Sequence, residues 1–180
     1  NQTHATRKQI VICTEEGDAV WGKADRNATM QILDNLMSNA VKFSPHQSTV
    51  QVKLAVANGY VSIGVKDQGP GLSAEDQKKL FGKFVRLSAQ PTGGESSTGL
   101  GLSIVKKLAE AMAGTVLCES VLGEGATFLL RLPACEESEI PLDSKAKAES
   151  AANKIPGAPN RDVAAQNPAT DSAKTPVRVS

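Results

Sequence analysis

Aromatic residues make up only 3% of this 180-residue chain, so a hydrophobic core must be built mainly from aliphatic side chains. Lys and Arg nearly balance Asp and Glu, the formal net charge is +1, and no run of five like charges occurs. Proteins that bind nucleic acid through bulk electrostatics carry a clear basic surplus. We therefore expect no nucleic-acid partner.

The chain has three cysteines, and none of their spacings is typical of a metal or redox site. Cys13 and Cys118 stand in apolar runs, and we expect both to be small buried hydrophobes. No apolar run approaches the roughly 20 residues that cross a membrane, and no signal peptide opens the chain. We expect a cytoplasmic domain; a membrane anchor of a parent protein would lie outside this chain.

Composition divides the chain near Pro133. Residues 136–180 contain no aromatic residue and no apolar periodicity, and Ala, Pro, Ser, Asn, Lys and Asp dominate them. Such a segment cannot bury enough apolar surface to offset its ordering entropy. We expect a leader at 1–7, a folded domain at 8–133, and a disordered linker or tail at 134–180.

The folded part shows an α/β pattern. Apolar spacing predicts helices from an N-cap at Asp25 to about 43, at 74–80 and at 99–112, with a mobile loop over 81–98. Alternation predicts strands at 9–14, 19–24, 50–56, 61–65, 115–120 and 126–132, with a hairpin turn at Asn58–Gly59. These elements predict a two-layer α/β sandwich, a mostly antiparallel mixed sheet with helices on one face.

A polar stripe follows the first long helix. Asn35, Asn39 and Lys42 are spaced i, i+4 and i+7, which places them within a stripe about 60° wide beside the apolar one. Amide oxygens are hard, neutral ligands suited to Mg²⁺, and a lysine one turn on can meet phosphate charge. By itself the spacing also fits an ordinary polar helix flank.

Two glycine-containing segments are the other candidates. Residues 67–71 read Asp-Gln-Gly-Pro-Gly: a carboxylate at a strand end can accept from an exocyclic amine, and the glycines permit close backbone approach. Residues 97–102 read Ser-Thr-Gly-Leu-Gly-Leu and open a helix, whose free amides can bind an anion. Taken singly, a tight turn and a loop-to-helix junction explain them equally well. The segment 97–102 is neither a P-loop nor a Rossmann fingerprint.

The segments together resemble the ATP-binding domain of histidine kinases. Residues 35–45 are similar to the family's N box, 67–71 to its G1 box, 80–84 to its F box and 99–102 to its G2 box, and the resemblance covers about 8–133. The family shares its α/β sandwich, the Bergerat fold, with gyrase, Hsp90 and MutL ATPases. The resemblance implies ATP and Mg²⁺ as cofactors.

The resemblance also implies roles for individual residues. Asn39 would ligate Mg²⁺, with Asn35 beside it, and Lys42 would contact phosphate. Phe43 would pack near the adenine, and Asp67 would bind the adenine amino group. The remaining implied residues shape the pocket floor (Gly69, Gly71), anchor the lid (Phe81, Phe84), reach the phosphates (Arg86), or open the G2 helix toward them (Thr98, Gly99, Leu100, Gly101, Leu102).

Asn35 bears on the reaction. In the related clamp ATPases the matching position is usually a glutamate that activates water, and Asn cannot act as a general base near neutral pH. The resemblance therefore implies transfer of the γ-phosphate to a histidine on a separate helical dimerisation domain, and from there to a response regulator. Neither His4 nor His46 lies in a helical apolar pattern, and we expect neither to be the acceptor. A regulatory nucleotide-binding module and a clamp-type ATPase remain the alternatives, and we expect the isolated domain to be monomeric.

Overall fold

The structure, a computed structural model, describes residues 2–15, 20–85, 87–93, 99–136 and 138. They belong to one compact unit that extends to Glu139. The tail expected from residue 134 onward lies almost wholly outside the described residues. Within the described ranges, no helix is both long and apolar enough to cross a membrane.

The sheet has five strands in the order β1-β2-β3-β5-β4, of which only the β1–β2 pair is parallel. The strands are β1 (Val11–Thr14), β2 (Thr49–Ala57), β3 (Tyr60–Lys66), β4 (Thr115–Ser120) and β5 (Ala126–Pro133). Asn58 and Gly59, with φ of 53° and 75°, join β2 to β3. Positive φ at both turn residues matches the right-handed twist of a tight hairpin, as the sequence predicts.

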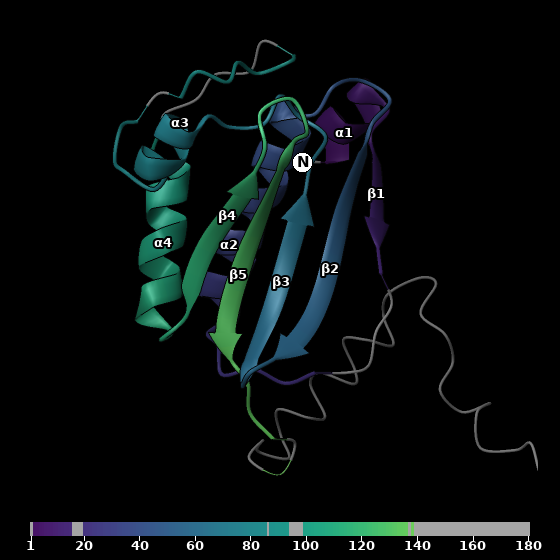
Figure 1. Ribbon diagram of the computed structural model, residues 1–180. Coiled ribbons are helices and arrows are strands. Elements are labelled where there is room, and N and C mark those ends of the chain that lie inside the picture. The colour runs from purple at the N-terminus through teal and green to yellow at the C-terminus, as the bar shows by residue number, and fades with distance from the viewer. Residues whose placement is uncertain (1, 16–19, 86, 94–98, 137, 139–180) are drawn as a thin grey trace, which may run out of the picture. The chain divides into compact units, whose positions relative to one another are not determined.

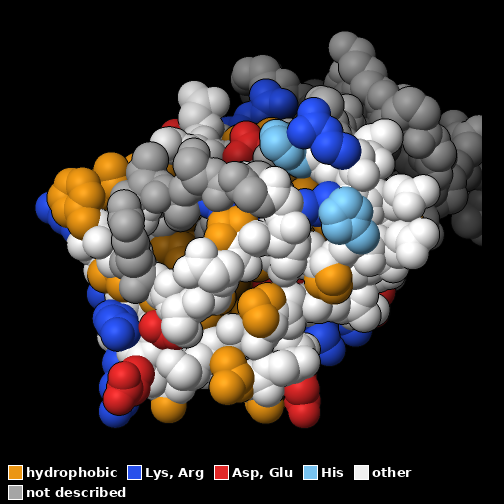
Figure 2. Space-filling view, turned by 90° about the horizontal axis from the view of Figure 1, so that it is seen from above, with side chains coloured by type: hydrophobic (Ala, Val, Ile, Leu, Met, Phe, Trp, Pro, Cys, Tyr) orange, Lys and Arg blue, Asp and Glu red, His pale blue; other side chains and the backbone are white. Residues whose placement is uncertain are grey.

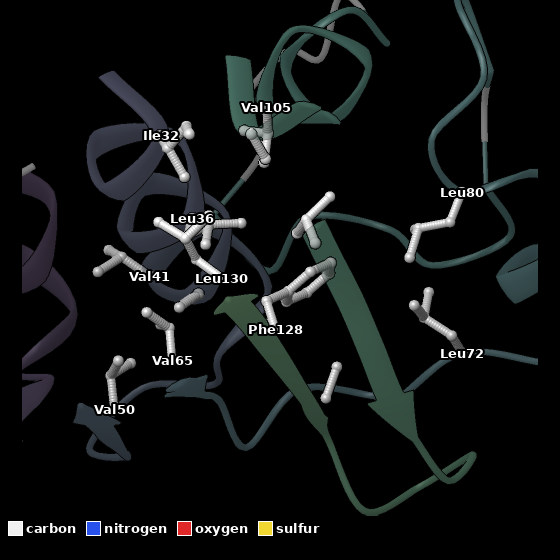
Figure 3. Packing of buried hydrophobic residues seen from close by; sticks show 14 of the residues in the cluster. Ile32, Leu36, Val41, Val50, Val65, Leu72, Leu80, Val105, Phe128 and Leu130 are labelled. Carbon is white, nitrogen blue, oxygen red and sulfur yellow. The ribbon is translucent and has the colours of Figure 1, made fainter. Parts of the chain in front are cut away.

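Two long helices, α2 (Arg26–Phe43) and α4 (Gly101–Ala111), cover one face of the sheet (Figure 1). Asp25 begins α2 by accepting a hydrogen bond from the Ala28 amide at 2.7 Å, the N-cap that the sequence predicts. In the core, Leu36 of α2 and Val105 of α4 are fully buried, and Figure 3 shows Leu36 beside Leu130 of the sheet. The expected sandwich is confirmed.

Two shorter helices complete the described unit. Helix α3 (Ala74–Lys79) begins at Ser73, whose hydroxyl accepts from the Asp76 amide at 3.1 Å. Helix α1 (Gln2–Lys8) packs against α2. Ala5 of α1 is only 5% exposed and belongs to the core cluster. The segment that the sequence suggests is a polar leader therefore carries a docked helix.

Two expectations about single segments are wrong. Cys13 is exposed on the edge strand β1, whereas Cys118 is partly buried against the core cluster. The strand expected at 19–24 is reduced, over its described residues, to one bridge between Gly22 and Ala134. The reason lies in β5, which has β3 along one edge and β4 along the other. Pairing with β4 starts at Arg131, so only the end of β5 beyond that residue is open to a further partner.

Candidate functional site

A cavity of about 430 Å³ lies among the ends of α2, α4 and β3, a size typical of sites for cofactors and small molecules. The structure brings several residues expected from the sequence to its wall: Asn39, Phe43, Asp67, Gly71, Gly99, Gly101 and Leu102. Gly69 lines an adjoining hollow that shares Phe43 and Gly71 with the cavity.

Asp67 follows the last residue of β3 and is 4% exposed. Its Oδ1 accepts from the amides of Gly69 at 2.8 Å and Ala126 at 3.2 Å. Burial raises the pKa of Asp67 above its ordinary value, and the two amide hydrogen bonds partly offset that rise. Among the described residues Oδ2 has no hydrogen-bond donor, so this oxygen is the one available to a ligand.

Glycines hold Asp67 in place by letting backbone approach it. A Cβ at Gly69 would lie 2.9 Å from Asp67 Oδ1 and 2.9 Å from the Phe43 carbonyl oxygen. A Cβ at Gly125 would overlap the Asp67 carbonyl oxygen, and Gly125 also has φ of +90°. Gly71, with φ of +68°, meets the backbone of Val121 in the same way. Only glycine fits such positions.

The polar stripe of α2 borders the cavity. Asn39 lines it directly. Asn35 Nδ2 donates to the Gln31 carbonyl at 2.9 Å, and Asn35 Oδ1 lies against Gly101, since a Cβ there would be 2.8 Å away. Lys42 is 9% exposed, and its Nζ lies 5.7 Å from the centroid of the Phe43 ring. Of the three stripe residues, Asn39 alone is among the described residues that line the cavity; Asn35 lies beside it against Gly101, and Lys42 lies beside Phe43.

The start of α4 lies across from that stripe. Gly99, with φ of +68°, accepts a hydrogen bond at its carbonyl from the Phe84 amide at 3.1 Å. Leu100 occupies the N-cap position and makes no side-chain capping bond there. The first amides of α4 are thus not capped by that side chain, which suits an anion site at the cavity.

The two phenylalanines of the F box differ in their surroundings. Phe81 packs against the core cluster. Phe84 is 72% exposed, so it differs from the packing anchor that the sequence suggests; its backbone, not its ring, holds Gly99. Arg86 and Thr98, the other expected contacts of this region, lie outside the described residues.

Much of the cavity wall consists of residues that the sequence motifs do not indicate. The cavity is also lined by apolar residues outside the boxes or at their margins, namely Leu72, Leu80, Val85, Leu87, Ala89, Pro91, Ala126 and Phe128, and by Gln90. Figure 3 shows Leu72 and Leu80 on the far side of Phe128 from Leu36. One signal was available: the Gly123–Glu124–Gly125 turn, whose second glycine has a role beyond the turn.

The described part of the site offers no cluster of the acidic, histidine or cysteine side chains that most protein metal sites use. Among the described residues, no three His, Cys, Asp or Glu side chains gather in a group that could hold an ion. Asn39 at the wall and Asn35 Oδ1 beside Gly101 fit Mg²⁺ instead, which takes few protein oxygens and completes its shell with water and substrate phosphates.

The fold and the cavity define a nucleotide-binding domain of the ATPase kind. A family profile described as "Histidine kinase-, DNA gyrase B-, and HSP90-like ATPase" matches residues 24–136, which is more than half of the chain, and the chain belongs to this family. Within it, the relatives and structural neighbours are sensor histidine kinases and their catalytic domains, so the resemblance to histidine kinases is confirmed.

The sensor histidine kinase WalK of Bacillus subtilis (strain 168) is 37% identical over 122 residues, which is 67% of this chain and 20% of WalK. The sensor-like histidine kinase SenX3 of Mycolicibacterium smegmatis is 31% identical over 141 residues, 78% of this chain and 37% of SenX3. The chain thus spans well under half the length of these relatives.

Solved structures agree. Full-length ShkA in complex with AMPPNP matches with a TM-score of 0.63 and 33% identity, over 74% of this chain and 27% of ShkA. The catalytic domain of histidine kinase ThkA matches with a TM-score of 0.62 and 26% identity, over 73% of this chain and 84% of that domain.

Proposed function

We propose that this domain binds Mg²⁺-ATP and transfers the γ-phosphate to a histidine on a separate helical dimerisation and phosphotransfer domain of its parent kinase. One observation carries the proposal: Asp67 is the only carboxylate among the described residues that line the cavity, while α2 offers the cavity an amide, Asn39. Such a site can select a nucleotide, and with Asp67 engaged by adenine no second carboxylate among the described lining residues is left to activate water.

Asp67 accounts for base selection. Two backbone amides fix Oδ1, so Oδ2 is left to accept from the exocyclic amine of adenine. Guanine presents a carbonyl oxygen at the corresponding position, and a carboxylate facing it would be repelled. Because Asp67 is buried, an unpaired carboxylate there is costly. We therefore expect preference for adenine over guanine nucleotides.

The triphosphate of ATP and its metal would be bound by Asn39, Asn35 and Lys42. Mg²⁺ bound there would neutralise phosphate charge and orient the γ-phosphate. Asn39 would hold it from the wall, with Asn35 Oδ1 beside Gly101 as a second oxygen. Lys42 would add positive charge next to Phe43, and amides at the start of α4 would bind phosphate oxygens.

Transfer to histidine fits a site whose described lining residues leave no general base for water. An imidazole needs no strong base once it is oriented, so positioning and charge neutralisation can carry the step. His4 and His46 are both exposed on the surface, as Figure 2 shows, and neither lines the cavity. The acceptor therefore belongs to another domain. The reaction would take place in the cytoplasm, where ATP is available, and the phosphate would pass from the histidine to a response regulator.

Calorimetry with and without Mg²⁺ tests which residues bind adenine and which bind the metal and the phosphates. Asn39→Ala should weaken ATP binding only when Mg²⁺ is present, because Asn39 acts through the metal. Asp67→Asn should weaken binding in both conditions, because it acts on the base. Equal losses for Asn39→Ala with and without Mg²⁺ would remove the metal role of this residue.

A phosphotransfer assay tests the reaction. The chain, incubated with γ-labelled Mg²⁺-ATP and the parent's helical domain as a separate polypeptide, should place acid-labile label on that domain's histidine. Transfer should be slow, since the two pieces lack a tether. Label on His4 or His46 would overturn the division of roles. Steady phosphate release by the chain alone would favour a clamp-type ATPase, and binding without transfer would favour a regulatory module.

A further inference from the structure

One wall of the cavity is a short stretch without regular structure, residues 87–92, which we call the wall segment. Leu87, Ala89, Gln90 and Pro91 of this segment line the cavity. The segment lies between the F box and the G2 box, within the loop that the sequence predicts to be mobile over 81–98. In the structure Ser88 and Thr92 hold it by hydrogen bonds to other elements, which differs from that expectation. Irregular backbone needs specific hydrogen bonds if it is to form a defined wall.

The first end of the wall segment is fixed to α3. Both the amide and the hydroxyl of Ser88 donate to Oδ2 of Asp76, the amide at 3.3 Å. Asp76 is 4% exposed, and the amide of Asp76 is itself capped by Ser73. The Ser88 hydroxyl holds the pKa of Asp76 below its usual range, so the carboxylate stays charged and keeps both bonds at neutral pH.

The second end is fixed to the last turn of α2. The Thr92 amide donates to the Lys42 carbonyl at 3.2 Å, and the Thr92 hydroxyl donates to the Ser44 carbonyl at 2.6 Å. These are carbonyls at a helix C-terminus, which have no partner within the helix. Thr92 thus joins the wall segment to the residues directly around Lys42 and Phe43.

Lys8 of α1 completes this second attachment. Its Nζ donates to Thr92 Oγ1 at 2.8 Å, to the Lys42 carbonyl at 2.8 Å and to the Val41 carbonyl at 3.0 Å. Lys8 is 3% exposed, so these bonds form away from water. A cation at a helix C-terminus is favourable, and bonds from a charged donor are stronger than neutral ones.

We propose that Thr92, held by Lys8, is a positioning residue for nucleotide recognition. Together with Ser88 on Asp76, it fixes the wall segment before ATP arrives, so binding does not have to order that segment. A wall that is already ordered gives higher affinity, because less conformational freedom is lost on binding. Since Lys8 belongs to α1, docking of α1 on α2 sets the affinity as well. This inference rests on the proposed binding of ATP.

The test uses the full chain, ATP with Mg²⁺, and calorimetry. Thr92→Val removes the hydroxyl but keeps the shape and the backbone bond. It should weaken ATP binding about tenfold, because the lost hydroxyl accepts a hydrogen bond from a charged donor, Lys8. Thr92→Ser keeps the hydroxyl and should restore the wild-type affinity. Lys8→Met should weaken binding at least as much, and the double variant should lose less than the sum, because both side chains act through one bond.

A matched control separates positioning from stability. Val61 is 6% exposed and pairs with Val56 near the turn that joins β2 to β3, at the opposite end of β3 from Asp67. Val61→Ala should lower the melting temperature without changing the dissociation constant for ATP. If Thr92→Val binds ATP as tightly as wild type, the positioning role is wrong. It is also wrong if Val61→Ala, with the same loss of stability as Thr92→Val, loses as much affinity for ATP. Failure of wild type itself to bind ATP would reject the proposed function instead.

Discussion

Gly125→Ala and Gly123→Ala form a matched pair within one turn. The two glycines have nearly the same backbone conformation, with φ of +90° and +89°. A Cβ at Gly123 meets nothing within 4 Å, whereas a Cβ at Gly125 overlaps the Asp67 carbonyl oxygen and lies 3.0 Å from the Asp67 carbonyl carbon. Both substitutions strain the backbone, but only Gly125→Ala displaces Asp67, the residue proposed to bind adenine.

The geometry sets the size of the effect. Strain at positive φ costs each variant about 1–2 kcal/mol of folding stability. Relief of the overlap at Gly125 requires backbone to move by about 1 Å. That shift would lengthen a hydrogen bond from Asp67 to the adenine amine beyond useful range. A hydrogen bond to a charged group contributes about 1.5–3 kcal/mol, so ATP affinity should fall by about 10- to 100-fold.

Thermal melts measure the loss of stability, and calorimetry with Mg²⁺-ATP, run below the melting temperature of either variant, measures the loss of affinity. Gly123→Ala should melt earlier than wild type and bind ATP with unchanged affinity. Gly125→Ala should melt earlier still and bind much more weakly. Equal affinity in the two variants would show that the contact between Gly125 and Asp67 does not position the carboxylate, and the reasoning would be refuted.

Three further predictions follow from ionisation. The raised pKa of Asp67 means that its neutral form supports folding below the unfolded value of 3.8, and that this support is lost as pH rises through the raised pKa. Over the same rise in pH the affinity for ATP should increase, because the carboxylate forms. Calorimetry on the Asp67→Asn variant should show no such increase, and an increase there would contradict the role of Asp67 in adenine binding. The lowered pKa of Asp76 means that its carboxylate stabilises the fold above 3.8 and loses that effect as pH falls through the lowered pKa. Ser88→Ala should therefore lower the melting temperature at neutral pH by an amount that shrinks in acid, and a pH-independent difference would count against it. Burial raises the pKa of Cys118 to about 12, so thiol reagents at pH 8 should label the exposed Cys13 first, as peptide mapping would show, and equal labelling rates would be inconsistent with this environment.

Sequence patterns predict the elements whose causes are local. Asp25 caps α2 through an amide three residues on, and the hairpin at Asn58–Gly59 needs only positive φ at two adjacent residues. The stripe of Asn35 and Asn39 follows from helical periodicity alone. Each of these features depends on residues a few positions apart, which a sequence displays directly.

The tertiary structure decided everything that depends on contacts between distant segments. Gly125 supports Asp67 from 58 residues away, because β5 lies beside β3, and no periodicity encodes that approach. Phe84 leaves its ring exposed, while its backbone amide donates to Gly99, 15 residues further along the chain. Lys8 is the first residue of the folded domain that the sequence predicts, and the sequence indicates no partner for it. In the structure its Nζ donates to carbonyls 33 and 34 residues away and to Thr92, 84 residues away. Only the folded chain brings these groups within hydrogen-bonding distance, since what fixes them is the packing of α1 on α2.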